Sequence, residues 1–243
     1  MRILISNDDG IYSPGIAELA TVAASFGEVR IVAPDVEQSS MGHAITHSRP
    51  LTLRRTSIHG FDAWRVNGTP ADCVALGSAM WDPVDVVLSG INLGPNLGNS
   101  MWHSGTLAAA KQAALLGLRG IAISTPVERD EPRFDTLRPF LIQVLEVLLP
   151  AGELPLVNVN LPREPKGLRW TCQSVRHYDG KVVPGRDPQG REHHWITVIP
   201  IEATDEGSDR WAVNQGFVSI TPLRLDLTDA EALERARAVH AVA

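Results

Sequence analysis

The chain has 243 residues, of which 44% are hydrophobic, and this length and apolar content suit one large α/β domain. Its formal net charge is −6 and it has no basic block, which argues against a nucleic-acid polymer as the main partner. With two distant cysteines and no apolar run of membrane-spanning length, the sequence excludes a disulfide framework, a zinc finger and a membrane partner, and we expect a cytoplasmic protein.

The first predicted strand, residues 3–6, ends in two adjacent carboxylates, Asp8 and Asp9, followed by Gly10. Open α/β sheets bind ligands at the carboxyl ends of their strands, so these carboxylates are candidate site residues. Adjacent carboxylates repel one another unless a cation lies between them, and a hard divalent cation is the usual partner. For this segment alone, an ordinary turn rich in Asn, Asp and Gly remains the alternative.

A helical pattern at residues 16–23 and a strand at residues 29–33 complete a βαβ unit, which favours a parallel sheet. The polar loop of residues 36–43 then leaves the carboxyl end of the second strand and should face the two carboxylates. Its serine hydroxyls and the flexible Gly42 suit a ligand, although a solvated loop explains the segment equally well. Strand candidates follow at residues 51–53 and 63–66.

Helix-start signals open the middle of the chain. Thr69 is the expected N-cap of a helix with Pro70 at its first position. A strand at residues 84–88 runs into residues 89–99, whose glycines, asparagines and proline exclude both helix and strand and indicate a functional loop. Asparagine amides in this loop suit both a cation and a phosphate.

Small residues, Ser104, Gly105 and Thr106, precede an alanine-rich helix at residues 107–116. A helix amino end with free backbone N–H groups forms an anion site, so we expect phosphate to bind there; simple N-capping by Ser104 or Thr106 is the alternative. Further along, residues 120–124 and 156–161 read as buried strands.

Later helices have their own start signals. Asp135 is expected to cap an amphipathic helix reaching residue 148, with Pro139 in its first turn. Thr228 begins a capping-box pattern that predicts a final helix.

Extended candidates separated by turn residues follow at residues 168–172, 195–199 and 217–221. Long hairpins that leave a compact body are a common oligomerisation device. We therefore predict an α/β fold: a three-layer α/β/α Rossmann-like core with a mainly parallel sheet, plus a C-terminal extended β-hairpin arm for oligomerisation. A single domain, residues 1–243, would comprise the core (1–165) and the hairpin region with the C-terminal helix (166–243).

Three of these elements converge on one rim of the sheet: the two carboxylates, the polar loop and the asparagine-rich loop with the helix start that follows it. Their plausible ligands are all oxygen atoms, which favours Mg²⁺ or Mn²⁺ over zinc. A hard cation beside a helix amino end is suited to a phosphate group.

Six segments of this chain, in order, resemble the signature segments of the SurE family of stationary-phase survival proteins. They are Asn7-Asp8-Asp9-Gly10, Ala33-Pro34-Asp35, Gly68-Thr69-Pro70-Ala71-Asp72-Cys73-Val74, Ser89-Gly90-Ile91-Asn92-Leu93-Gly94-Pro95-Asn96, His103-Ser104-Gly105-Thr106 and Gly216-Phe217-Val218-Ser219-Ile220-Thr221-Pro222-Leu223. The resemblance implies a phosphatase that hydrolyses nucleoside 5′-monophosphates and often 3′-monophosphates, with polyphosphate as a further substrate of some members. It also implies one divalent cation per subunit and a homodimer or homotetramer whose hairpins exchange.

The family's metal ligands carry over to Asp8, Asp9, Ser39 and Asn92, with Ser40 as the fallback for the serine. The cation would bind a phosphate oxygen and lower the pKa of a bound water. Phosphate-binding residues would be Gly42 from the polar loop together with four residues of the Asn-rich loop and helix start: Asn96, Ser104, Gly105 and Thr106.

The catalytic assignments are Asp8, Asp9 and His43. His43 is a candidate proton donor to the leaving alkoxide, or else a structural loop histidine. Residue types do not decide whether Asp8 activates water or attacks phosphorus itself. Lys111 faces either solvent or ligand, and Trp102 either stacks on a base or packs in the core.

Two other classes of function remain open. A dinucleotide-binding oxidoreductase is disfavoured because no Gly-x-Gly-x-x-Gly follows the first strand. A non-catalytic metal- and nucleotide-binding protein would keep the same residues, and metal-dependent turnover separates it from the enzyme.

Overall fold

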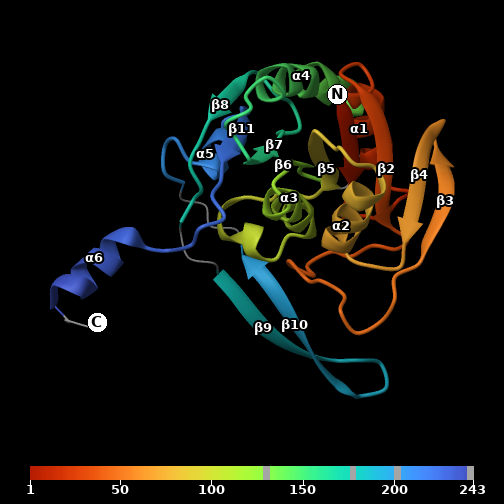
Figure 1. Ribbon diagram of the computed structural model, residues 1–243. Helices are drawn as coiled ribbons and strands as arrows, with labels where there is room; N and C mark the ends of the chain where they lie inside the picture. Colours follow the sequence, from red (N-terminus) through yellow and green to blue (C-terminus); the bar gives the residue numbers. More distant parts are fainter. Residues whose placement is uncertain (128–131, 176–178, 200–203, 240–243) are drawn as a thin grey trace.

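The computed structural model describes residues 1–127, 132–175, 179–199 and 204–239. Within these ranges no helix is long and apolar enough to cross a membrane. The fold is a layered α/β structure with a separate two-stranded arm, as Figure 1 shows.

A nine-stranded, mainly parallel sheet forms the centre of the molecule. Its strands are β1 (Arg2–Ser6), β2 (Glu28–Pro34), β3 (Leu53–Ile58), β4 (Phe61–Val66), β5 (Val86–Leu93), β6 (Arg119–Thr125), β7 (Leu156–Asn160), β8 (Leu168–Trp170) and β11 (Val218–Pro222). Their order across the sheet is β3-β4-β2-β1-β5-β6-β7-β11-β8. The six strands from β4 to β7 are parallel, whereas β3 pairs with β4 and β11 pairs with β7 in the antiparallel sense. The carboxyl ends of β1, β5 and β6 therefore meet at one rim.

Helices cover both faces of this sheet. The helices of the described residues are α1 (Pro14–Ala23), α2 (Pro70–Met80), α3 (Gly105–Leu115), α4 (Phe134–Leu148), α5 (Asp209–Asn214) and α6 (Ala230–Val239), with a short 3-10 helix, η1 (Gly98–Trp102). Apolar residues of α1 and α4 share one buried cluster with the strands, and those of α2 and α3 share another on the opposite face. Two such clusters confirm the predicted three-layer α/β/α core.

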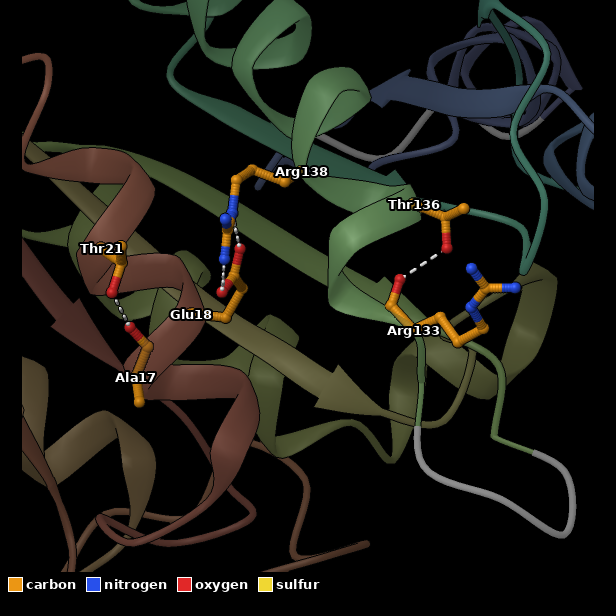
Figure 2. Close-up of polar contacts among 6 residues, drawn as sticks. All are labelled: Ala17, Glu18, Thr21, Arg133, Thr136 and Arg138. Atoms are coloured by element: carbon orange, nitrogen blue, oxygen red, sulfur yellow. Dashed lines mark hydrogen bonds and ion pairs between the residues drawn. The ribbon is translucent and has the colours of Figure 1, made fainter.

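The packed pair α1 and α4 is also joined at its surface. Arg138 of α4 donates two hydrogen bonds to the carboxylate of Glu18 on α1, at 2.7 and 2.9 Å, as Figure 2 shows. A bidentate guanidinium–carboxylate pair fixes orientation as well as distance. The pair therefore helps to set how the two helices lie on the sheet.

The predicted arm is a hairpin of β9 (Asp179–Arg186) and β10 (Glu192–Ile199), which pair only with each other. Figure 1 shows the arm leaving the body, and α6 lying apart from the sheet. No residue of α6 is buried. Residues beyond 165 also return to the main sheet as β8 and β11. Our sequence patterns did not predict β9 or α5, and the candidate at residues 51–53 overlaps β3 only at its last residue.

The expectation that residues 89–99 contain neither helix nor strand is wrong at both ends. β5 continues through Leu93, with an irregular register against β6, and η1 begins at Gly98. Gly90 explains the continuation, because it has φ +137° and a Cβ atom there would lie 2.2 Å from the carbonyl oxygen of Ile123. The glycine thus allows a close strand–strand approach that any side chain would prevent.

Three helix-start expectations also need correction. Arg133, rather than Asp135, is the N-cap of α4, and Asp135 lies in the first turn. Pro139 lies inside that helix, beyond its first turn. Asp229, rather than Thr228, caps α6 by accepting the backbone N–H three residues later. Each acidic residue still lies near the positive end of its helix, so the predicted helix starts were correct to within one or two residues.

Candidate active site

Asp8 and Asp9 lie where β1 ends, at the rim predicted for them. The chain turns at Gly10, whose φ of +94° favours glycine and where a Cβ atom would lie 3.3 Å from the backbone of Val36. The polar loop is tied to the same corner, since Gln38 N donates to Asp8 O at 2.7 Å. The loop after β2 therefore covers the end of β1, as the βαβ topology requires.

The amino end of α3 holds the carboxylate of Asp8. Thr106 Oγ1 donates to Asp8 Oδ1 at 2.7 Å, and Ser104 caps the helix by accepting Leu107 N at 3.0 Å. A Cβ atom on Gly105 would lie 2.7 Å from Asp8 Cβ, so only glycine permits this approach. The helix start predicted to bind phosphate thus first binds a carboxylate of the protein itself.

Both carboxylates are less acidic than usual. Burial raises the pKa of Asp8, against the opposing effect of the Thr106 hydrogen bonds, and the side chain is only 4% exposed. Burial likewise raises the pKa of Asp9 to about 6, although Leu93 N donates to it at 3.1 Å. The nearby carboxylate of Glu37 raises both pKa values further. Negative charge is therefore gathered here without compensation, which is typical of functional sites.

A cavity of about 620 Å³ opens beside Asp8. Its lining comprises Asp8, Ser39, Ser40, Asn92, Leu93, Gly94, Pro95, Asn96, Ser100, His103, Ser104 and Ile196. Predicted residues from the first strand end, the polar loop, the asparagine-rich loop and the start of α3 are thus brought together around one space. Asp9, Gly42, Gly105 and Thr106 adjoin these residues without forming part of the lining.

The asparagines are held by specific hydrogen bonds. Asn92 Nδ2 donates to Gly94 O at 2.6 Å, which leaves its side-chain carbonyl oxygen as an acceptor. Asn96 N donates to Asn160 Oδ1 at 2.8 Å, and the Asn96 carbonyl accepts from Asn158 and Asn160 of β7. These two β7 side chains therefore fix the backbone of the asparagine-rich loop.

The side-chain amide of Asn96 has a structural role in this arrangement. Its Nδ2 donates to Ser124 Oγ at 2.8 Å and to Thr106 Oγ1 at 3.3 Å. Thr106 thus links Asn96 to Asp8. Two residues predicted to bind phosphate therefore also support the position of the buried carboxylate.

The donor types present fit a hard divalent cation. Asp8 and Asp9 have no cationic neighbour among the causes that shift their pKa values, and Asn92 and Ser39 add neutral oxygen atoms. Ser39 Oγ donates to Glu37 Oε1 at 2.6 Å, so the Glu37 carboxylate also lies at this corner. Within the described part of the chain no three His, Cys, Asp or Glu side chains gather as a metal site. The set thus resembles a mixed oxygen site rather than a zinc site.

The structure separates the two histidines near the site. His43, the predicted proton donor, lies outside the cavity lining, and its Nε2 donates to Gln112 Oε1 on α3 at 2.9 Å. His103 lines the cavity instead. His103 enters the predictions from sequence only as part of a motif. Its position directly before the Ser104 cap could have indicated that it lies near the candidate site.

Ile196 is the second residue that sequence reasoning missed. It comes from β10 of the arm, and it lines the cavity although most of the residue is exposed. The arm, predicted only as an oligomerisation device, thus supplies an apolar wall of the candidate active site. No local pattern in the sequence indicates where a hairpin points.

The chain is similar to known proteins in both sequence and fold. The family model described as Survival protein SurE matches residues 3–180. The chain is 46% identical to 5′-nucleotidase SurE 1 of Thermus thermophilus over 94% of this chain and 93% of that protein. It is 44% identical to 5′-nucleotidase SurE of Deinococcus radiodurans, covering 93% and 88% of the two chains. The crystal structure of the SurE protein from Aquifex aeolicus superposes with a TM-score of 0.84 at 37% identity, covering 98% and 99%.

Proposed function

Because the chain belongs to the SurE family, we propose that it is a divalent-metal-dependent phosphatase that hydrolyses nucleoside 5′-monophosphates to nucleoside and phosphate. The observation that carries this proposal is the buried Asp8 carboxylate, which Thr106 holds at the edge of a cavity lined with oxygen donors. Nucleoside 3′-monophosphates and short polyphosphate are further proposed substrates, since all present the same terminal phosphate.

Asp8, Asp9, Ser39 and Asn92 would hold Mg²⁺ or Mn²⁺. When bound, such a cation polarises a phosphate oxygen and lowers the pKa of a coordinated water. The protein's own part is to keep both carboxylates ionised and correctly placed, for which Thr106 donates to Asp8 and Leu93 N donates to Asp9.

The phosphate would lie between Asn92 and the amino end of α3, where the helix dipole favours negative charge. Gly105 contributes its backbone N–H there, while the Asn96 side chain holds Thr106 in place. Leu93 and Ile196 add apolar surface to the cavity lining, which suits the nucleoside. This arrangement orients the phosphate toward the carboxylates and the base toward the arm.

We assign the proton donor for the leaving alkoxide to His103 rather than to His43, because His103 is the histidine in the lining of the cavity. His103→Asn should lower kcat at least tenfold while leaving metal affinity unchanged, and His43→Asn is the matched control. Equal losses in both variants would contradict this assignment.

The arm supports a homodimer or homotetramer in our proposal. Val182, Val183, Trp195 and Ile196 expose apolar side chains on an isolated hairpin. Exposed apolar surface of this kind is typical of a protein–protein interface. Sedimentation analysis of the whole chain, with Trp195→Ser as a comparison, would test whether the arm joins subunits.

The decisive experiment measures phosphate release from nucleoside 5′- and 3′-monophosphates with Mg²⁺ or Mn²⁺, with EDTA, and with Asp8→Asn. We expect metal-dependent release that the substitution abolishes. A folded protein that releases no phosphate with either metal would refute catalysis and favour a binding protein, whereas release that persists in EDTA would refute the metal.

A further inference from the structure

A second cavity, of about 300 Å³, lies beside the candidate active site. The short helix η1 and the residue after it separate the two: Ser100 and His103 line the first cavity, whereas Met101 and Trp102 line the second. A volume of this size is at the lower end of the range of small-molecule sites. The proposed hydrolysis uses none of this cavity's side chains.

The charged side chains that line the second cavity are all basic. Lys111, Arg224 and the titratable His43 contribute to it, and no Asp or Glu among the described residues does so. An organic acid placed here would therefore meet the cationic groups of Lys111 and Arg224. The chain as a whole is acidic, so this local excess of positive charge is a property of the cavity rather than of the surface in general.

Lys111 is the most informative of these groups. Its ammonium lies 5.6 Å from the ring centroid of Trp102, and burial lowers its pKa. Within the described ranges no carboxylate forms an ion pair with it, and no neighbouring charge contributes to its pKa. A half-buried ammonium without an anion costs free energy, which a bound anionic group would offset.

Apart from Gln173, the rest of the cavity lining is apolar, and part of it is exposed to solvent. Trp102 is 55% exposed and Leu115 is 59% exposed, and leucines from the segment after β11 complete the wall. An indole ring beside a cation offers a flat surface for a flat apolar ligand. The apolar wall and the basic residues thus both favour a ligand that combines a flat apolar ring with an acidic group.

We propose that this second cavity binds an aromatic anion, with its acidic group on Lys111 and Arg224 and its ring against Trp102. The site is distinct from the phosphatase cavity and does not depend on the phosphatase proposal. Trp102 and His103 are consecutive residues. A ligand bound against Trp102 would therefore also affect His103 in the lining of the active-site cavity.

The test uses 8-anilinonaphthalene-1-sulfonate, an aromatic sulfonate that fluoresces when bound, titrated into the full chain. We expect saturable binding that weakens about tenfold in Lys111→Met, the loss typical of one hydrogen bond to a charged group. Arg224→Gln should weaken binding in the same direction, which keeps the test independent of one variant's folding.

Lys166→Met is the matched control, because the ammonium of Lys166 also lies over an aromatic ring, that of Phe217 at 4.8 Å, but lines neither cavity. Its affinity for the dye should equal that of the wild type. Non-saturable fluorescence, or equal affinities in Lys111→Met, Arg224→Gln and Lys166→Met proteins with unchanged circular dichroism, would overturn the proposal.

Discussion

Replacing Asp9 with asparagine should make the metal-free protein more stable at neutral pH while abolishing its phosphatase activity. Burial raises the pKa of Asp9 from its ordinary value near 3.8 to about 6. The folded state therefore binds this proton more tightly than the unfolded state does. Stability from this group is fully present below pH 3.8 and is lost as the pH rises through about 6.

The size of this gain in stability follows from the pKa shift of Asp9. Two pKa units correspond to roughly 3 kcal/mol, and the partial exposure of the side chain reduces this to about 1–2 kcal/mol. Asparagine keeps the carbonyl oxygen that accepts Leu93 N and carries no charge at any pH. The gain in the free energy of unfolding should thus be near zero at pH 4 and reach its full value by pH 7.

Urea denaturation of both proteins in EDTA, at intervals from pH 4 to pH 8, measures the difference between their free energies of unfolding. The titration of the other groups is common to both proteins and cancels in this difference. Added Mn²⁺ should then stabilise the wild type and leave the variant largely unchanged. A difference between the two proteins that stays constant across the pH range, or a variant that is less stable at pH 7, would refute the reasoning.

Three further predictions concern residues around the same carboxylates. Thr106→Val removes the hydrogen-bond donor to the buried Asp8 carboxylate and should lower kcat/KM at least tenfold in a phosphate-release assay. The control Thr21→Val loses a hydroxyl on a helix surface, and its kcat/KM should match that of the wild type. Gly105→Ala places a methyl group 2.7 Å from a carboxylate side chain, so we expect loss of metal binding by calorimetry with the circular dichroism retained. Ile196→Ala should raise the KM for nucleotides about threefold to tenfold and leave the KM for phenyl phosphate unchanged. Val183→Ala, on the other face of the arm, should change neither KM value. Equal effects of the two substitutions would contradict the proposal that Ile196 contacts the nucleoside.

Much of the site could be predicted because the apolar runs of strands and the start signals of helices are encoded locally. Asp8 follows the apolar run of β1, Asn92 lies near the carboxyl end of β5, and Ser104 precedes a run of helix formers. Parallel topology then places these ends at one rim without further information.

What could not be predicted depends on contacts between distant segments. Whether His43 or His103 reaches the cavity is decided by how two loops fold over α3, which neither loop's composition indicates. Ile196 reaches the cavity because the arm leaves the body at a particular angle. Gly90 was taken as a loop signal because its packing against Ile123 O becomes visible only when β5 and β6 are side by side.

The same comparison supports our proposal that this rim is the functional site. At the Thr69 capping box of α2, local signals and tertiary packing agree. At the rim they conflict, since Asp8 is buried although charged and the glycine at the start of α3 forgoes a better helix former. Gly105 is required only because the helix must approach the Asp8 carboxylate closely. A fold under selection for stability alone would lose both features, so their joint presence argues that the ionised carboxylate itself is used.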